Sequence, residues 1–342
     1  GHIASMNHWD RLDAALRAGL LDRLPVALWR HWPEVDHDPL ALARAVMAWQ
    51  RRFDFDLTVF TAQQTCVAEQ FGASTVYRNE PYGRRHVERL RIEDPRQWLE
   101  LRSRSGSCSV LTELNVGLRR VAEALGGTVP LIQSVPSPLT TAWHLAGDAL
   151  FGHMRSDPEC VATALQAITE STVDFVRAAI ESGACGIRLI VRIPASAPFT
   201  IEEHRRFARR FDTEVVQATG AAPNWNLLEV DAHSAWLDAF VDYPVQLLTC
   251  CDQSNDANPS SVAKRFGGIV AGGIDAGGPL VGGTRSACFE EAVSAVSSLE
   301  QVRAMIATGG ACRTDTPETQ IDALIEAVRR PADTATEEGR AR

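Results

Sequence analysis

The chain has 342 residues, a hydrophobic content of 45% and a formal net charge of −9. This is enough apolar material for one large domain or two small ones, and the acidic balance argues against a general nucleic-acid binder or a polybasic membrane surface. No apolar run approaches the roughly 20 residues of a membrane helix, and eight scattered cysteines predict reduced thiols in a cytoplasmic protein. The first five residues, GHIAS, look like an expression scar, so the native chain is expected to begin at Met6.

Short apolar runs rich in β-branched residues alternate with longer helical patterns along the chain. Apolar residues at helical spacing predict helices over residues 38–53 and 157–182, and both begin with Asp-Pro, an N-cap followed by proline at the first helical position. Strands are predicted at residues 25–29, 56–60, 129–135, 186–191, 226–230, 245–251, 268–274 and 304–310. Eight strands alternating with helices favour a single closed (β/α)8 barrel of the TIM type, with a doubly wound open sheet as the alternative. The barrel is assigned to residues 6–330, and the polar tail 331–342 is expected to be disordered.

In barrel enzymes the active site lies at the carboxyl ends of the strands. Applying this rule to the predicted strands gathers ionisable and soft side chains at one end of the barrel. The residues placed there are Arg30, His31, Gln63, Gln64, His144, Arg192, Glu229, Asp231, His233, Cys250, Cys251, Asp252, Asp275, Cys312 and Asp315. This clustering predicts an enzyme.

The stretch NLLEVDAHSAWLDAF, residues 226–240, carries three polar groups at alternate positions. Glu229, Asp231 and His233 follow a hydrophobic run, and alternate residues of a strand point to the same face. The three side chains are therefore expected to converge. They are metal ligands, acid–base catalysts or the polar end of a strand.

Other candidates have a structural interpretation beside the functional one. Arg30 either binds a substrate anion or pairs with Glu34 one helical turn further on. His144, at the start of an apolar helix, is either a catalyst or a buried, hydrogen-bonded histidine. Adjacent Cys250 and Cys251 point to opposite faces of an extended strand, so at most one of them faces the site.

Six segments resemble the uroporphyrinogen decarboxylase superfamily. They occur in the family's order, from about residue 20 to residue 330, and read PVALWRHWPEVD, FDFDLTVFTAQQTCVAEQFGA, SPLTTAWHLAGDALFGHMRSDPE, DYPVQLLTCCD, RFGGIVAGGID and TDTPETQIDALIEAV. The resemblance implies a single (β/α)8 barrel. Members of this superfamily include porphyrinogen decarboxylases and zinc-dependent methyltransferases that move methyl groups to thiols, and cobalamin-independent methionine synthase shares the architecture more distantly.

The decarboxylase machinery of that family carries over only in part. Arg30 matches the first of two arginines that hold substrate carboxylates, but the second falls near Glu34 and is absent. The family's pyrrole-binding aspartate falls near Leu57, and its tyrosine in the third loop aligns with His144. The family's serine after the fourth strand aligns near Arg192. The resemblance therefore implies chemistry on a substrate other than a porphyrinogen.

The zinc ligands of the methyltransferase branch are also replaced. That branch uses His-x-Cys on the fifth strand and a late Gly-Cys, where this sequence has Glu229-x-Asp231-x-His233 and a displaced Cys312. Zinc accepts carboxylate, imidazole and thiolate ligands, so these residues and Cys251 remain a possible zinc site. Fewer thiolate ligands would make a metal-bound thiol a weaker methyl acceptor.

Three functional hypotheses follow. The first is a lyase or decarboxylase that needs no cofactor and acts by acid–base chemistry on a small carboxylate- or phosphate-bearing metabolite. Its predicted substrate-binding residues are Arg30, His31, Gln63 and Arg192, and its predicted catalytic residues are His144, His233 and Asp252. The second is zinc-dependent methyl or alkyl transfer, or a metal-assisted lyase. Its predicted ligands are Glu229, Asp231, His233, Cys251 and Cys312. The third is a non-catalytic relative that binds a ligand. A homodimer is expected, without nucleic-acid or membrane partners.

Overall fold

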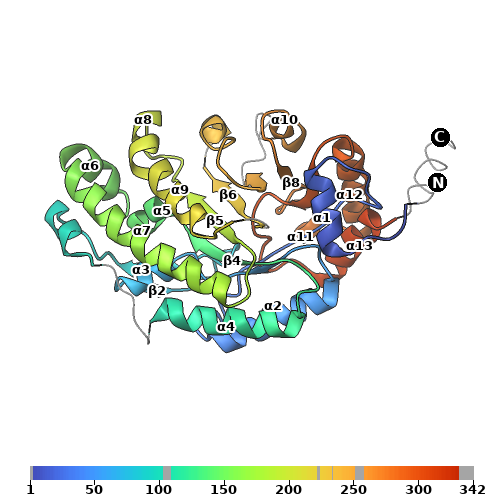
Figure 1. Cartoon of the computed structure of the whole chain (residues 1–342), viewed down its shortest axis with the longest axis horizontal. Coiled ribbons are helices and arrows are strands. Elements are labelled where there is room, and N and C mark those ends of the chain that lie inside the picture. Colours follow the sequence, from blue (N-terminus) through green and yellow to red (C-terminus); the bar gives the residue numbers. More distant parts are fainter. Residues whose placement is uncertain (1–2, 103–108, 222–223, 233, 251–257, 331–342) are drawn as a thin grey trace.

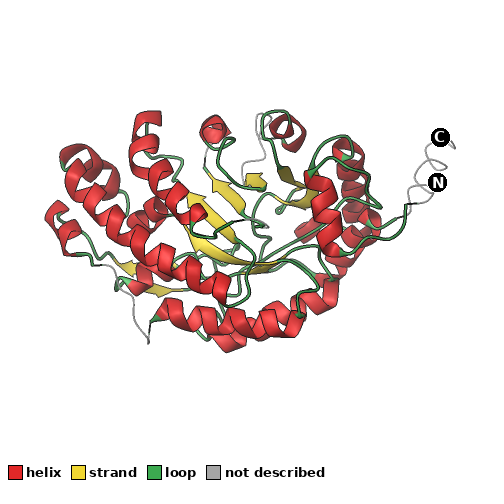
Figure 2. Cartoon of the chain, in the orientation of Figure 1, coloured by secondary structure: helices red, strands yellow, loops and turns green. Residues whose placement is uncertain are grey.

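A curved parallel sheet forms the centre of the protein, with helices along its outer side (Figures 1 and 2). The computed structural model describes residues 3–102, 109–221, 224–232, 234–250 and 258–330. Seven strands pair in parallel in the order β1-β4-β5-β6-β7-β8-β9. Their bounds are β1 Thr58–Phe60, β4 Leu131–Pro136, β5 Ile187–Arg192, β6 Leu227–Asp231, β7 Leu247–Cys250, β8 Ile269–Ile274 and β9 Ala304–Thr308.

The segment 25–29 takes the eighth position and joins the two edges of this sheet. Val26 forms a parallel bridge with Ile306 of β9, and the Ala27 N–H donates to the Ile306 carbonyl at 3.0 Å. On the other side, the Asp56 N–H donates to the Val26 carbonyl at 3.0 Å, just before β1. The fold is therefore an α/β barrel of the TIM type, as predicted, and the open-sheet alternative is wrong. The predicted first strand is reduced to one bridge.

Helices surround the strands, and two of them, α2 and α7, are the helices predicted at residues 38–53 and 157–182. The helices are α1 His8–Leu16, α2 Pro39–Phe53, α3 Cys66–Gln70, α4 Val110–Leu125, α5 Pro138–Ala146, α6 Ala149–Ser156, α7 Pro158–Glu181, α8 Ile201–His204, α9 Arg210–Gln217, α10 Pro259–Ala263, α11 Pro279–Gly282, α12 Arg285–Leu299 and α13 Glu318–Val328. Asp38 caps α2 by accepting the Ala41 N–H, and Pro39 holds the first helical position, as expected. None of the described helices is long and apolar enough to cross a membrane.

An antiparallel hairpin that the sequence pattern does not predict follows β1. Its strands are β2 (Ser74–Val76) and β3 (His86–Arg89), and the loop 77–85 joins them. The loop reaches the barrel mouth, where the Thr314 N–H donates to the Pro81 carbonyl at 2.9 Å. Gly83 has a φ of +78°, and a Cβ there would lie 2.7 Å from the Cβ of His31. Only glycine allows this close approach without displacing the loop.

The strands separate two apolar cores. Outward-facing residues of β5 and β6, such as Leu189 and Leu228, pack against the helices. Inward-facing Leu227 of β6 packs instead with Leu247 and Ile269, the first layer inside the barrel. This alternation leaves the inward positions further along each strand for other side chains. Among the described cysteines, Cys66, Cys160, Cys185, Cys288 and Cys312 are free thiols, as the composition predicts.

Candidate functional site

The inward side chains of β6 change from apolar to acidic along the strand. Leu227 lies in the apolar core, Glu229 is buried above it, and Asp231 lies partly exposed at the mouth. The neighbouring strand β5 carries Arg188 and Arg192 on its own inward face, and they pair in register with Leu227 and Asp231. The two strands therefore contribute a buried pair of opposite charges and an exposed pair above it.

A buried ion pair forms the floor of the barrel mouth. Arg188 is 0% exposed, and it donates to both carboxylate oxygens of Glu229, from Nη2 at 2.6 Å and from Nε at 3.1 Å. The Trp29 indole donates to the same carboxylate at 3.0 Å, and Arg188 also donates to the Ser134 hydroxyl at 3.0 Å. Such bidentate pairing offsets part of the free-energy cost of burying the two charges.

His31 is the next member of this buried group. Its Nε2 lies 3.2 Å from Nη1 of Arg188, which can only donate, so the ring nitrogen accepts. Burial, and then the positive charge of Arg188, hold the pKa of His31 well below its ordinary value. His31 is therefore neutral and supports the floor rather than meeting a substrate directly.

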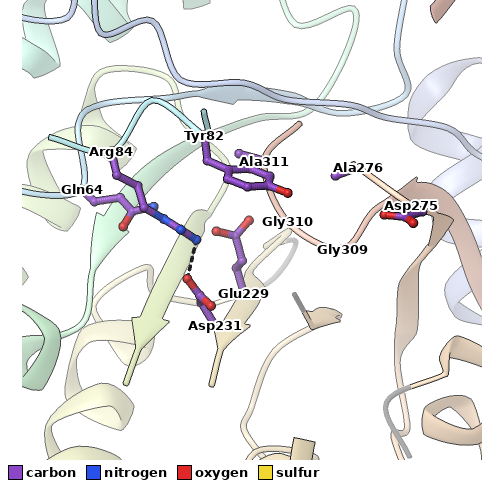
Figure 3. A pocket seen from close by; sticks show the side chains of 10 residues that line it. All are labelled: Gln64, Tyr82, Arg84, Glu229, Asp231, Asp275, Ala276, Gly309, Gly310 and Ala311. Atoms are coloured by element: carbon purple, nitrogen blue, oxygen red, sulfur yellow. Dashed lines mark hydrogen bonds and ion pairs between the residues drawn. The ribbon is translucent and has the colours of Figure 1, made fainter. Parts of the chain in front are cut away.

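Two arginines meet one carboxylate at the mouth itself. Arg84 comes from the hairpin loop, and its Nη2 donates to Oδ2 of Asp231 at 2.5 Å (Figure 3). Arg192 of β5 places its Nε 3.6 Å from the same oxygen. Its guanidinium carbon also lies 5.2 Å from the centre of the Trp143 ring. The three charged groups remain partly exposed, unlike the pair beneath them.

A cavity of about 250 Å³ lies above this floor, and we call it the axial chamber. Its lining side chains come from the segment after β1, from the hairpin loop and from the ends of β6, β8 and β9 (Figure 3). The lining residues are Gln64, Tyr82, Arg84, Glu229, Asp231, Asp275, Ala276, Gly309, Gly310 and Ala311. The chamber thus gathers three carboxylates and one guanidinium at the carboxyl ends of the strands, where the barrel rule places an active site.

A second cavity of about 530 Å³ adjoins the chamber at Arg84, and we call it the side cavity. It lies between the hairpin and α5. Its lining residues are Arg78, Glu80, Arg84, Arg85, His86, Val87, Leu90, Trp143, His144, Gly147, Asp148 and Arg192. Four arginines line it together with Glu80 and Asp148; Arg85 pairs with Asp36 at 3.0 Å just outside the lining, whereas Arg84 and Arg192 share the single carboxylate of Asp231. Two guanidiniums on one carboxylate favour an anionic ligand.

His144 and Arg192 are brought together by this arrangement, as the sequence predicts for site residues. His144 lies on α5 and is buried, and its Nδ1 has no hydrogen-bond partner. Burial, and then the charge of Arg192, lower the pKa of His144 to about 3. The imidazole is therefore neutral near neutral pH, and it is poorly suited to deliver a proton there.

Other predicted site residues lie outside both cavities. Arg30 donates to Glu34 at 2.9 Å and to the Thr314 carbonyl at 3.1 Å, and it stacks on Trp32. The ion-pair interpretation of Arg30 therefore describes this structure, and its binding of an anion stays a prediction. Gln63 is buried beside the site. The predicted roles of His233, Cys251 and Asp252 concern positions outside the described residues.

The described donors do not fit a zinc site. Both oxygens of Glu229 accept from Arg188, and Asp231 accepts from Arg84. Cys312 is buried in the apolar core, where burial raises the pKa of its thiol to about 12. Within the part of the chain that the structure describes, no three histidine, cysteine or acidic side chains gather as metal ligands. A ligand set that includes the described residues would have to break these pairs first.

We expect Asp231→Asn to leave the metal content of the purified protein unchanged, because Asp231 serves two arginines rather than an ion. Inductively coupled plasma mass spectrometry on protein prepared without chelator measures this directly. The unsubstituted protein, incubated with zinc and desalted in parallel, is the control. A near-stoichiometric divalent ion that disappears in the variant would contradict the expectation.

The sequence pattern does not identify two of the central residues. Arg188 lies within the apolar run GIRLIV, and its charge is the signal that marks it, since buried arginines are rare unless paired. Arg84 carries no comparable signal, because it comes from a loop whose direction the local sequence does not specify.

Comparison with known proteins places this barrel among its relatives. The family model for uroporphyrinogen decarboxylase (URO-D) matches residues 10–331. The methylcobamide:CoM methyltransferase MtbA of Methanosarcina mazei is 21% identical over 339 residues, which cover 94% of this chain and 97% of that protein. MtbA of Methanosarcina acetivorans is 24% identical over 225 residues, and this match spans 61% of this chain and 65% of that relative's length.

Two solved structures show the same fold. A methyltransferase from Methanosarcina mazei superposes with a TM-score of 0.79 at 17% identity, covering 94% of this chain and 98% of that one. A B12-independent methionine synthase from Shewanella sp. W3-18-1 superposes with a TM-score of 0.56 at 12% identity, covering 94% and 96%. At these identities the likeness concerns the fold alone, and function rests on the site.

Proposed function

Since this chain belongs to the uroporphyrinogen decarboxylase family, we propose that it transfers a methyl group to a small anionic acceptor bound at the mouth of its barrel. The observation that carries this proposal is that two arginines at the mouth, Arg84 and Arg192, share the one carboxylate of Asp231. The relatives named above, which match over most of their length, are methyltransferases. A methylated corrinoid is the donor that the names of the two curated relatives suggest.

Binding would proceed by exchange of partners at Asp231. In the free protein this carboxylate accepts from Arg84 and faces Arg192, so it acts as an internal counter-ion. An incoming carboxylate or sulfonate would take its place on one of the two guanidiniums. The planar guanidinium can form two parallel hydrogen bonds to such a group, which fixes the orientation of the acceptor.

The transfer then requires a proton acceptor. The bond from the methyl carbon to its donor atom breaks, a bond to the acceptor atom forms, and the acceptor atom loses its proton. Asp231, once displaced from an arginine, and Asp275 are the chamber carboxylates available to take that proton. Glu229 is excluded from this role because Arg188 holds both of its oxygens.

The proposal is tested with methylcobalamin as donor and two thiols that differ in charge. We expect 2-mercaptoethanesulfonate to be methylated and uncharged 2-mercaptoethanol to react at least tenfold more slowly in kcat/KM. Arg84→Gln should lower kcat/KM for the sulfonate by about 10- to 100-fold, the cost of losing a charge-assisted hydrogen bond, and should barely affect 2-mercaptoethanol. Arg44→Gln, which alters an exposed arginine on α2 outside both cavities, is the matched control.

Mass spectrometry of the thioether product measures the reaction. Absence of methylated product with either thiol, or equal rates for the two thiols, would contradict the proposal. Product that forms at the same rate with Arg84→Gln would show that another group selects the acceptor.

Decarboxylation of a small acid is the second candidate, since the unpartnered Nδ1 of buried His144 beside Arg192 would donate a hydrogen bond to a substrate carboxylate. An arginine that holds the departing carboxylate stabilises the ground state and opposes loss of CO2, so the substrate would need a second acidic group for the arginines to bind. Carbon dioxide release from dicarboxylates, with none from the matching monocarboxylates, would distinguish this reaction from methyl transfer.

A further inference from the structure

We propose that the side cavity binds the apolar body of an aromatic carboxylate, whose acidic end meets the arginines at the mouth. This inference rests on the proposed function, because it extends the same substrate site from the axial chamber into the side cavity. It narrows the substrate class from any small anion to an anion that carries an aryl group.

The size of the two cavities sets the first constraint. The axial chamber, at about 250 Å³, holds little more than the reacting end of a substrate, whereas the side cavity measures about 530 Å³. Cavities of about 300–1,000 Å³ are typical of sites for organic ligands. Arg84 lines both cavities, so a ligand that spans them passes this guanidinium.

The lining of the side cavity combines charged and apolar side chains. The guanidiniums of Arg78, Arg84, Arg85 and Arg192 and the acids Glu80 and Asp148 line it together with Val87, Leu90 and Trp143. Leu90 is 42% exposed, and a ligand in the cavity would cover it. A ligand that matches this lining has an apolar body and a negative charge.

The Trp143 ring is held in a fixed position at this cavity. Its indole N–H donates to Asp148 at 3.0 Å, and the guanidinium of Arg192 lies 5.2 Å from the ring centre. Tryptophan rings favour aromatic neighbours in offset or edge-to-face packing. The ring therefore supplies a surface for an aryl group close to an arginine that binds a carboxylate.

His144, the neighbour of Trp143, has a buried ring nitrogen that lacks a hydrogen-bond partner. The residue is 6% exposed and lines the cavity, and its Nδ1 has no hydrogen-bond partner. A buried nitrogen left without a partner costs about 1–3 kcal/mol. A ligand oxygen beside Arg192 would supply that partner, since a neutral imidazole can donate from Nδ1.

Isothermal titration calorimetry with 3-phenylpropanoate tests the inference without a methyl donor. We expect this probe to bind at least tenfold more tightly than propanoate, which lacks the ring, and than 3-phenylpropan-1-ol, which lacks the charge. Leu90→Glu and Arg78→Glu each place a negative charge on one exposed wall, and each should weaken binding by about tenfold or more. Arg44→Glu, the matched charge reversal on α2, should leave binding unchanged.

His144→Phe keeps a ring of similar size and removes the nitrogen, so it should also weaken the probe by about tenfold. Circular dichroism confirms that each variant is folded. Equal affinity for 3-phenylpropanoate and propanoate, or an unchanged affinity in Leu90→Glu, would overturn the inference. Because the probe is measured without turnover, failure of methyl transfer leaves this result standing. Conversely, if small thiols are methylated but 3-phenylpropanoate does not bind, the aryl site is contradicted and the proposed methyl transfer is not.

Discussion

Replacing Arg188 by methionine is expected to lower the free energy of unfolding by about 3–5 kcal/mol, the cost of breaking a buried ion pair. Methionine is similar in length, so the packing volume changes little, but both oxygens of Glu229 lose their cationic partner. The carboxylate would then be buried with one remaining hydrogen bond, from the Trp29 indole. The loss is large because the uncompensated carboxylate is almost wholly buried, with Glu229 only 2% exposed.

Urea unfolding followed by circular dichroism measures this difference. The double variant Arg188→Met/Glu229→Leu removes both charges and should recover most of the lost stability, because an apolar pair of similar volume replaces the ion pair. Arg192→Met, on the same face of β5 but partly exposed, is the matched control and should cost about 1 kcal/mol or less. A double variant as unstable as Arg188→Met would show that shape, rather than charge pairing, stabilises the floor.

The second large effect is expected at the opposite end of the barrel, where Asp56→Ala should also cost about 3–5 kcal/mol. Asp56 is fully buried and accepts from Arg11 at 2.6 Å, Arg23 at 2.8 Å and His8 at 2.7 Å. It also accepts the Val26 N–H at 2.8 Å, at the segment that closes the barrel. Alanine would leave Arg23 without its carboxylate partner, would leave Arg11 and His8 with only Asp22 and Asp54, and would remove the side-chain acceptor of the Val26 N–H.

The same cluster predicts how stability depends on pH. Burial opposes ionisation of Asp56, but the hydrogen bond from His8 and the charges of Arg23 and Arg11 outweigh it and hold the Asp56 pKa well below 3.8. This contribution is present above pH 3.8 and is lost as the pH falls through the lowered pKa. The hydrogen bond to Asp56 raises the pKa of His8 above 6.5, so its contribution is present below pH 6.5 and is lost as the pH rises through the raised pKa.

Urea unfolding at pH 5.5 and pH 8.5 tests the statement about His8. The unsubstituted protein should lose stability between these values, and His8→Asn should remove most of that loss. Asp56→Ala should be destabilised at both pH values and should show little difference between them. A fall of the same size in His8→Asn would assign the dependence to other groups.

The fold can be predicted from the sequence because strands and helix starts are marked by patterns within short segments of the chain. Alternation along β6 is visible in the letters of residues 227–231, so inward positions for Glu229 and Asp231 could be predicted. The Asp-Pro pair at 38–39 likewise marks the start of α2. The partners of these residues could not be predicted in the same way. That Glu229 pairs with Arg188 depends on the register between two strands separated by about one helix and its loops, which no local pattern specifies.

The site is less predictable than the fold for the same physical reason. The sequence places Arg30 at the end of the first barrel segment, yet its pairing with Glu34 is stabilised by contacts with Thr314, which lies far along the chain. Arg84, which completes the mouth, belongs to a hairpin whose short strands give little alternation to detect. The arrangement of side chains at this mouth therefore depends on contacts between segments that lie far apart in the sequence.

The hairpin loop also bears on how this barrel can acquire new substrates. It is an excursion between β1 and α4, and it contributes Tyr82 and Arg84 to the chamber without forming part of the barrel sheet. The position of the loop on the barrel is fixed by the close approach of Gly83 to His31 and by the hydrogen bond from the Thr314 N–H. Exchange of the other loop residues would thus alter ligand selection while the charged floor and the strand ladder stay intact. Evolutionary diversification of this scaffold can proceed in the loop, at little cost to the foldability of the chain.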